Sequence, residues 1–152
     1  MKKSRKLAAI MFTDIVGYTA LMQADEEHAA EVRSRHREVF NQSHSDFGGD
    51  ILQYYGDGTL SVFKSAVDAV ECAILIQKSL RDNSPKVDLR IGIHIGDVVH
   101  SDHEVYGDGV NLASRIENIS SAGSILISSR LNEELKNHKS ISTESIGQYQ
   151  FK

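Results

Sequence analysis

Short apolar runs and helically spaced apolar residues alternate along the chain, and this pattern predicts a mixed domain of strands and helices. Residues 7–12 form a continuous apolar run of strand length, as expected for a central strand that is covered on both faces. A helix is predicted over residues 25–45, because acidic residues open it and favour its positive N-terminus. The pair Gly48-Gly49 then predicts where this helix ends.

A hairpin, a second helix and a long strand follow. Residues 51–55 and 59–63 are two short runs on either side of a Gly-Asp-Gly turn, which predicts a β-hairpin. The second helix is predicted to begin after Ser65, a residue type favoured at N-caps, and to end before Pro85. Apolar residues then alternate with other residues, which predicts a half-buried strand over residues 89–99.

The rest of the chain predicts additions to this core. They are a helix over residues 110–118, a strand over 124–128, a helix over 129–137 and one or two weak strands over 141–151. The order strand, helix, hairpin, helix, strand is the split βαβ arrangement of ferredoxin-like folds. The sequence therefore predicts an α+β fold with a ferredoxin-like βαββαβ core and C-terminal α/β additions.

Composition narrows the classes of protein. A length of 152 residues suits one domain with one sizeable hydrophobic core. The net charge of −4 argues against a domain devoted to nucleic acid. The single Cys72 offers neither a disulfide nor a cysteine metal site and fits a reducing compartment. Residues 7–12 are too short for a membrane span or a secretory signal, so we expect a cytoplasmic domain without membrane contact.

Two aspartates, Asp14 and Asp57, stand where an apolar run leads into a glycine turn. Each carboxylate is therefore expected to project from an edge of the sheet beside exposed backbone. Two hard oxygen ligands placed in this way suit the two magnesium ions that manage a nucleoside triphosphate. Taken singly, each residue is better explained as an ordinary turn aspartate, so the assignment depends on the rest of the chain.

A second polar group comes from the predicted helix over residues 110–118. Asn111 and Arg115 lie four residues apart on it and therefore share one face. A guanidinium is always charged and donates several hydrogen bonds in one plane, which suits contact with a phosphoryl group. Taken alone, this polar face is better explained as solvated surface.

Four segments taken together resemble the catalytic domain of the class III adenylate and guanylate cyclases of the bacterial type. They occur in the order and spacing of that family, from about residue 7 to the end of the sequence. Any one of them is a weak signal, whereas four in register are a strong one. The segments are Phe12-Thr13-Asp14-Ile15-Val16-Gly17, Gly56-Asp57-Gly58, Arg90-Ile91-Gly92-Ile93-His94-Ile95-Gly96 and Tyr106-Gly107-Asp108-Gly109-Val110-Asn111-Leu112-Ala113-Ser114-Arg115.

The resemblance implies roles for single residues. Asp14 and Asp57 match the metal-binding aspartates, and Ile15 matches the residue whose backbone carbonyl also binds metal. The implied cofactors are two Mg²⁺ (or Mn²⁺) ions. Asn111 matches the residue that orients the ribose, and Arg115 matches the one that stabilises the α-phosphoryl transition state. The implied phosphate contacts are the backbone amides of Val16, Gly17, Tyr18 and Thr19, together with Lys152.

The implied reaction is intramolecular, because the ribose 3′-oxygen displaces pyrophosphate in line and gives a 3′,5′-cyclic nucleotide. Positioning and charge neutralisation suffice, so no covalent nucleophile is required. The resemblance also implies a head-to-tail homodimer, in which each site combines the metal side of one chain with Asn111 and Arg115 of the other. Residues 1–152 would then be one catalytic domain, a fragment of a longer protein with its regulatory domains outside the fragment.

Base choice is where the sequence departs from the family pattern. The base-recognition positions fall on Gln53, Glu104 and Val105. Adenylate cyclases of the family commonly carry lysine and aspartate at the first two positions, and guanylate cyclases typically carry glutamate and cysteine. Glu104 accepting from the adenine 6-amino group while Gln53 donates to ring N1 favours ATP. GTP bound by the same pair with Gln53 rotated, or a pyrimidine stacked on Tyr54 or Tyr55, remains an alternative.

Two other classes of function stay open beside a nucleotidyl cyclase, which is a phosphorus–oxygen lyase. The first is a catalytically silent, cyclase-like module for nucleotide sensing or dimerisation. The presence of both aspartates, Asn111 and Arg115 counts against it. The second is a palm-type polymerase relative with a ferredoxin-like fold, in which the helix of Asn111 and Arg115 has no obvious place.

Overall fold

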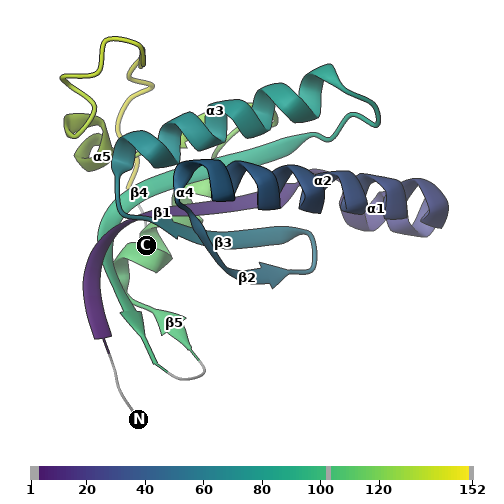
Figure 1. Ribbon diagram of the computed structural model, residues 1–152, viewed down its shortest axis with the longest axis horizontal. Helices are drawn as coiled ribbons and strands as arrows, with labels where there is room; N and C mark the ends of the chain where they lie inside the picture. Colours follow the sequence, from purple (N-terminus) through teal and green to yellow (C-terminus); the bar gives the residue numbers. More distant parts are fainter. Residues whose placement is uncertain (1–3, 102–103, 151–152) are drawn as a thin grey trace.

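The computed structural model describes residues 4–101 and 104–150, and within them the chain forms a six-stranded sheet with helices packed against it (Figure 1). The elements in chain order are β1 (Ser4–Ile15), α1 (Tyr18–Ala24), α2 (Glu26–Phe47), β2 (Asp50–Tyr55), β3 (Gly58–Phe63), α3 (Ala66–Asp82), β4 (Leu89–His100), β5 (Val105–Tyr106), α4 (Asp108–Asn118), β6 (Ile125–Ile127) and α5 (Ser129–Glu133).

The strand order confirms the predicted fold class. The strands lie in the order β2-β3-β1-β4-β5, each antiparallel to its neighbour, and β6 pairs with β4 in parallel. The four strands of the βαββαβ core therefore lie in the order of a ferredoxin-like sheet, with β1 and β4 side by side. This places the C-terminal end of β1 next to the N-terminal ends of β3 and β4.

Alternation along β1 sends its side chains to two different hydrophobic clusters. Ala9 belongs to the larger cluster, which α2 and α3 cover as they lie side by side across the sheet (Figure 1). Ala8 and Ile10 belong to a smaller cluster that α4 completes through Val110. We call the two sides of the sheet the α2/α3 face and the α4 face. By the same alternation, Asp14 at the end of β1 lies on the α4 face.

Local signals fix the predicted helix boundaries. The Asp25 side chain caps α2 by accepting from the backbone N–H of His28 at 3.1 Å. Gly48 ends the same helix with a φ of 70°, a left-handed conformation that glycine adopts without strain. Ser65 caps α3 by accepting from the backbone N–H of Asp68 at 3.3 Å. These helices agree with the sequence prediction because their capping residues are local in sequence.

The structure adds two elements that the sequence pattern does not predict. Helix α1 fills the segment between the first glycine turn and Asp25, where we expect only a turn. Its N-cap is Gly17, with a φ of 74° and no side-chain cap, so the usual N-terminal signal is missing. Strand β5 has only two residues, which is too short for any periodic pattern to show.

The C-terminal predictions are only partly correct. Strand β6 and helix α5 are present, although α5 ends at Glu133 rather than at residue 137. Residues 141–150 form no strand, so the prediction of one or two weak strands there is wrong. Gly147, with a φ of 112°, takes the backbone out of the extended conformation in the middle of the segment. Phe151, the last residue of the predicted strands, lies outside the described residues.

Two expectations from composition can be compared with the fold. Cys72 is fully buried in the larger cluster, and burial raises the pKa of its thiol to about 12, which makes it a poor nucleophile. No helix within the described residues has the length and apolar character needed to cross a bilayer.

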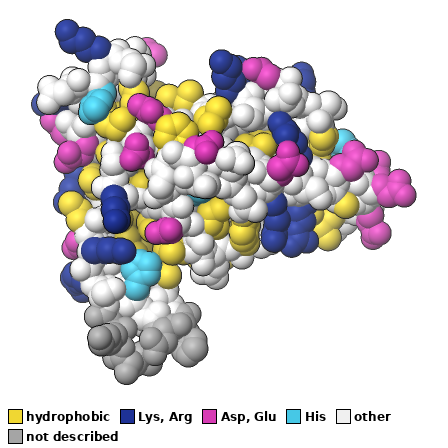
Figure 2. Space-filling view, viewed as in Figure 1, with side chains coloured by type: hydrophobic (Ala, Val, Ile, Leu, Met, Phe, Trp, Pro, Cys, Tyr) yellow, Lys and Arg dark blue, Asp and Glu magenta, His cyan; other side chains and the backbone are white. Residues whose placement is uncertain are grey.

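Figure 2 shows acidic side chains gathered at the end of the molecule where α1 meets α2. The first turn of α2 carries Glu26 and Glu27.

A buried histidine under α2 makes stability depend on pH. The His36 ring stacks on Phe40 with ring centroids 4.1 Å apart and meets the edge of Tyr54. Its Nε2 atom is buried without a hydrogen-bond partner among the described residues. Burial, with a smaller contribution from the charge of Arg37, lowers the pKa of His36 from 6.5 to about 4. The folded protein therefore holds this ring neutral.

We predict that acid destabilises the protein through His36. Between pH 6.5 and about 4 the unfolded chain binds this proton and the folded chain does not, so the stability present above pH 6.5 falls as the pH drops. The loss attributable to His36 is about 3 kcal/mol. Denaturant unfolding of His36→Phe, which keeps the aromatic stack, should show a shallower decline with pH than the wild type. The exposed His28→Phe is the control, and an identical decline in wild type and His36→Phe contradicts the prediction.

Candidate active site

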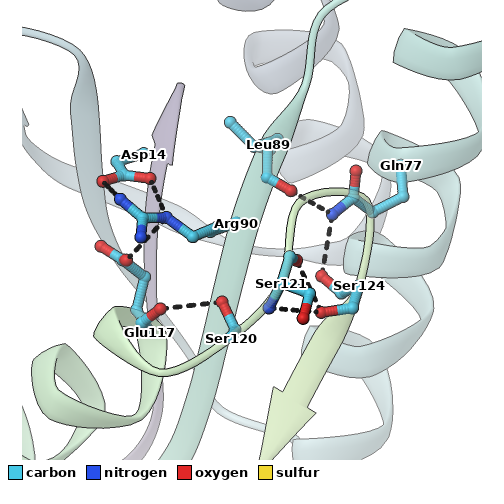
Figure 3. Close-up of polar contacts among 8 residues, drawn as sticks. All are labelled: Asp14, Gln77, Leu89, Arg90, Glu117, Ser120, Ser121 and Ser124. Atoms are coloured by element: carbon cyan, nitrogen blue, oxygen red, sulfur yellow. Dashed lines mark hydrogen bonds and ion pairs between the residues drawn. The ribbon is translucent and has the colours of Figure 1, made fainter. Parts of the chain in front are cut away.

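The first predicted aspartate is held by an arginine on the neighbouring strand (Figure 3). Asp14 and Arg90 stand directly opposite each other on antiparallel β1 and β4, so their side chains share one face of the sheet. Arg90 donates from Nε to Oδ1 at 3.0 Å and from Nη2 to Oδ2 at 2.8 Å. This bidentate contact with the Asp14 carboxylate raises the pKa of Arg90, chiefly through the hydrogen bonds.

The second predicted aspartate lies in the turn between β2 and β3, next to the end of β1. The backbone N–H of Ile15 donates to the carbonyl oxygen of Asp57 at 2.8 Å. Gly58 pairs with Asp14, and a Cβ on Gly58 would lie 2.6 Å from the carbonyl oxygen of Thr13, so only glycine fits there. The glycine thus lets the turn close onto β1, and Asp57 comes near enough to influence the pKa of Arg90.

A third carboxylate, which the sequence reasoning does not single out, completes this cluster. Glu117 of α4 lies on the other side of Arg90, with 3.8 Å between its Oε2 and Arg90 Nε (Figure 3). Its side chain is only 7% exposed. Burial, followed by the negative charge of Asp14, raises the pKa of Glu117 to about 7, and Arg90 offsets this only in part. Arg90 stabilises Glu117 weakly because its hydrogen bonds go to Asp14.

A local signal for Glu117 exists in the sequence. It falls four residues after Ala113 and seven after Val110, both on the buried face of α4, so it belongs to an apolar stripe. A carboxylate at such a position needs a partner in the core. Gly92 supplies the space, since a Cβ there would lie 2.3 Å from the backbone nitrogen of Glu117.

The predicted phosphate loop lies between β1 and α1. Gly17, Tyr18 and Thr19 form the N-terminal turn of α1, whose first backbone N–H groups have no partner within the helix. The buried Tyr18 side chain anchors this turn in the larger cluster. The backbone N–H of Val16 already donates to the carbonyl oxygen of Asp88 at 2.8 Å, so the structure gives it a partner other than a phosphate. Lys152, the other predicted phosphate contact, lies outside the described residues.

Asn111 and Arg115 lie together on the exposed face of α4, as predicted. Arg115 is about 200° and Asn111 about 240° around the helix axis from Glu117, at about 100° per residue. Glu117 faces the carboxylate cluster, so the other two side chains point away from it. Among the described residues, neither hydrogen bonds to Asp14 or Asp57. One chain therefore does not bring the two predicted halves of the site together.

The predicted base-recognition residues come from β2 and from the edge around β5. A bulge at residue 52 interrupts the pairing of β2 with β3, and Gln53 stands opposite Leu60 of the smaller cluster. Gln53 is exposed and shares that face. Glu104 is exposed and precedes β5, where its carbonyl oxygen accepts from the backbone N–H of Ser101 at 2.9 Å. Val105 packs against the same smaller cluster.

Two tyrosines that could stack on a base have different surroundings. Tyr54 faces α2, where the Arg37 guanidinium lies 4.2 Å from its ring centre and its hydroxyl donates to Asn41 Oδ1 at 3.3 Å. Tyr55 points to the opposite face and stacks with Phe12 at 6.1 Å between ring centroids, with 41% of its surface exposed. Only Tyr55 therefore lies on the α4 face, beside the carboxylate cluster.

The donor set fits a hard divalent cation. Asp14 and Asp57 contribute carboxylate oxygens from adjacent strand ends, and Mg²⁺ and Mn²⁺ prefer such ligands. No group of three or more ligating side chains gathers for a metal within the described residues. Mg²⁺ needs no such group, because one or two carboxylates together with substrate phosphates and water complete its coordination. Asp14 and Asp57 can hold the ion as long as Arg90 leaves the oxygens of Asp14 accessible.

A hollow of about 730 Å³ lies elsewhere, between α4, β6 and residues 146–150. Its apolar lining includes Leu112, Ile116 and Ile119, and none of its lining residues is a predicted site residue. The carboxylate cluster therefore lies outside this hollow.

Comparisons with known proteins agree on one family. The family described as the adenylate and guanylate cyclase catalytic domain matches residues 1–152. A putative adenylate cyclase 3 of Rhizobium meliloti (strain 1021) is 36% identical over 155 residues, which cover 97% of this chain and 26% of that protein. An adenylate cyclase of Streptomyces coelicolor is 32% identical over 132 residues, covering 84% of this chain and 34% of that protein.

Solved structures give the same result. The crystal structure of an adenylate/guanylate cyclase/hydrolase from Silicibacter pomeroyi superposes with a TM-score of 0.88 and 31% identity, covering 98% of this chain and 91% of that one. The chain spans about a quarter to a third of the length of the two curated relatives.

Proposed function

This chain belongs to the family of adenylate and guanylate cyclase catalytic domains, and from this premise we propose that it converts ATP to cyclic 3′,5′-AMP and pyrophosphate. The observation that carries the proposal is the placement of four side chains. Asp14 lies near the end of β1, Asp57 lies in the turn that closes onto that end, and Asn111 and Arg115 share the exposed face of α4.

The proposed cofactors are two Mg²⁺ or Mn²⁺ ions held by Asp14, Asp57 and the backbone carbonyl of Ile15. When bound, they would lower the pKa of the ribose 3′-hydroxyl and neutralise charge on the departing pyrophosphate. The backbone N–H groups of Gly17, Tyr18 and Thr19 would bind phosphate oxygens at the start of α1. We propose Val16 and Lys152 as further phosphate contacts, Val16 only after its N–H leaves Asp88.

The chain's own side chains position the reacting atoms. Asn111 would hold the ribose so that its 3′-oxygen lies in line with the α-phosphorus and the leaving oxygen. Arg115 would donate to the α-phosphoryl oxygens as negative charge builds up on them. Both are exposed, so a triphosphate can reach them.

The proposed active form is a homodimer with two shared sites. Asn111 and Arg115 point away from the carboxylate cluster of their own chain, which supports completion of each site by a second copy. In a head-to-tail, two-fold arrangement each chain would supply the aspartates of one site and the α4 face of the other. The rate of turnover would then rise more steeply than linearly with protein concentration, until nearly all of the protein is dimeric.

The catalytic domain is proposed to be one part of a longer cytoplasmic protein. The matched regions make up only 26% and 34% of the two curated relatives, which supports regulatory domains outside residues 1–152. No contact with nucleic acid or membrane is required for the proposed reaction.

The base is assigned to adenine through Gln53, Glu104 and Val105. Gln53 and Glu104 are both exposed, and their neighbours in sequence, Leu52 and Val105, both pack against the smaller cluster. An exposed carboxylate accepts from an amino group, which adenine carries at the position where guanine carries an oxygen. GTP is the second candidate, because a rotated Gln53 amide accepts where it otherwise donates.

We predict that Glu104→Ala lowers discrimination between ATP and GTP. Loss of the acceptor for the 6-amino group should reduce kcat/KM for ATP by about tenfold and change kcat/KM for GTP much less. Initial rates with both nucleotides give the ratio directly. Asp97→Ala, which removes an exposed carboxylate of β4, the strand that pairs with β5, is the matched control and should leave the ratio unchanged. An unchanged ratio in Glu104→Ala would remove this residue from base recognition.

The proposed function is tested by incubating the protein at high concentration with ATP, GTP, CTP or UTP and Mn²⁺ or Mg²⁺. A 3′,5′-cyclic product from ATP, identified by mass and chromatography, is the expected result. Nucleotide binding without any cyclic product would favour the silent sensing or dimerisation module instead.

A further inference from the structure

Arg90 occupies both oxygens of the aspartate to which the proposed function assigns a metal. Its two hydrogen bonds to Asp14, at 3.0 and 2.8 Å, use one carboxylate oxygen each. The Asp14 side chain is 21% exposed and that of Arg90 is 33% exposed, so the pair is partly shielded from water. Each oxygen keeps a second lone pair, but a divalent cation bound there would lie beside the positive charge of the guanidinium, so the two cations compete for Asp14.

Glu117 is a second carboxyl group within reach of the same guanidinium. Its Oε2 lies 3.8 Å from Arg90 Nε, which is beyond hydrogen-bond distance. That oxygen is buried and has no hydrogen-bond partner among the described residues. A buried carboxylate oxygen without a partner is costly, so a partner that becomes available is bound there favourably.

The backbone prevents Glu117 from moving away. The close approach of α4 to β4 at Gly92 fixes the Glu117 backbone against the strand that carries Arg90. Arg90 is the flexible member of the cluster, because its long side chain is attached two residues before Gly92 and is a third exposed. A small rotation of its guanidinium closes the gap to Glu117.

We propose that Arg90 is a built-in cation that holds Asp14 in the metal-free protein, and that a divalent cation displaces it from Asp14 onto Glu117. The inference rests on the proposed function for the role of Asp14 as a metal ligand. Arg90 and Glu117 are then positioning residues that set the metal affinity of the site. Arg90 also limits the repulsion among Asp14, Asp57 and Glu117 when no metal is bound.

Charge explains why the second anion is needed. A guanidinium left beside a newly bound divalent cation would be repelled by it, since neither charge can be neutralised by losing a proton. On Glu117 the guanidinium keeps an opposite charge next to it. The metal then binds Asp14 in place of Arg90, and the guanidinium nitrogens of Arg90 donate to the previously unpaired Oε2 of Glu117.

The test measures binding of Mn²⁺ alone, without nucleotide, by the electron paramagnetic resonance signal of free Mn²⁺. Arg90→Gln should bind Mn²⁺ roughly tenfold more tightly than the wild type, because the competing cation is gone. Arg90→Lys should fall between the two, since lysine keeps the charge but contacts Asp14 at one point. Glu117→Gln should bind about threefold more weakly, because Arg90 loses its alternative partner.

The double variant Arg90→Gln/Glu117→Gln separates this exchange from simple charge effects. If Glu117 acts through Arg90, the Glu117 substitution has no effect once Arg90 is absent. An equal effect in both backgrounds overturns the inference, as does equal affinity of Arg90→Lys and wild type or weaker binding by Arg90→Gln. Thermal melting of each metal-free variant confirms folding, and Arg90→Lys, alone and combined with Glu117→Gln, still tests the inference if Arg90→Gln does not fold.

Asp14→Asn distinguishes the inference from the proposed function. If it leaves Mn²⁺ binding unchanged, Asp14 is not a metal ligand and both fail. If it weakens Mn²⁺ binding while the Arg90 variants match the wild type, the proposed metal site stands and the exchange does not.

Discussion

Replacing Asp57 by asparagine is expected to lower kcat about a thousandfold or more, while the domain remains folded. The substitution removes one negative charge and one of the two carboxylates proposed to hold the metal ions. The turn itself should survive, because its contact with β1 runs through the backbone carbonyl of Asp57 and the N–H of Ile15. Turnover at saturating ATP and Mn²⁺ and the thermal melting curve measure the two effects separately.

The matched control for this prediction is Asp50→Asn. It makes the same chemical change at the start of the same hairpin, at an exposed position away from the β1 edge. Its activity should equal that of the wild type. If Asp57→Asn keeps more than about a tenth of the wild-type kcat, a metal role for this residue is untenable.

Arg115→Ala is expected to lower kcat by about a hundredfold to a thousandfold with little change in KM. The reason is that its guanidinium is proposed to meet charge that develops only in the transition state. Because Arg115 is exposed on α4, its truncation should change the free energy of unfolding by less than about 0.5 kcal/mol. Steady-state kinetics over a range of ATP concentrations separate kcat from KM.

Two further variants test the proposed role of Arg115 in the transition state. Arg115→Lys should recover only part of the lost rate, because an ammonium lacks the planar set of donors. Arg33→Ala, which removes an exposed arginine of α2, should be as active as the wild type. A large rise in KM at constant kcat for Arg115→Ala would mean that the residue binds the ground state and not the transition state.

The core fold could be predicted because its signals are local. The first apolar run, the Gly-Asp-Gly turn and the caps Asp25 and Ser65 each lie within a few residues of the element that they define. Helix α1 was not predictable in this way, since Gly17 opens it without a side-chain cap. The prediction of strands over residues 141–151 is wrong because a strand-like composition does not indicate the bend of the backbone at Gly147.

The candidate site could be proposed from the sequence as a set of residues, but its geometry could not. Motif spacing identifies Asp14, whereas its contact with Arg90 depends on the register of β1 against β4, which no local pattern specifies. Glu117 could have been identified from the sequence, because it is a carboxylate within the apolar stripe of α4. The outward direction of Asn111 and Arg115 follows from the same stripe, and it is the structural reason to expect a partner chain.

Mixing two inactive variants tests the shared site most directly. Asp57→Asn lacks the metal side but keeps an intact α4 face, and Arg115→Ala has the converse defect. Random assortment of equal amounts makes half of the dimers mixed, each with one complete site, so roughly a quarter of the wild-type activity should return. Activity in the mixture that stays at the sum of the two separate variants, under conditions where dimers exchange subunits, would contradict a site built from two chains.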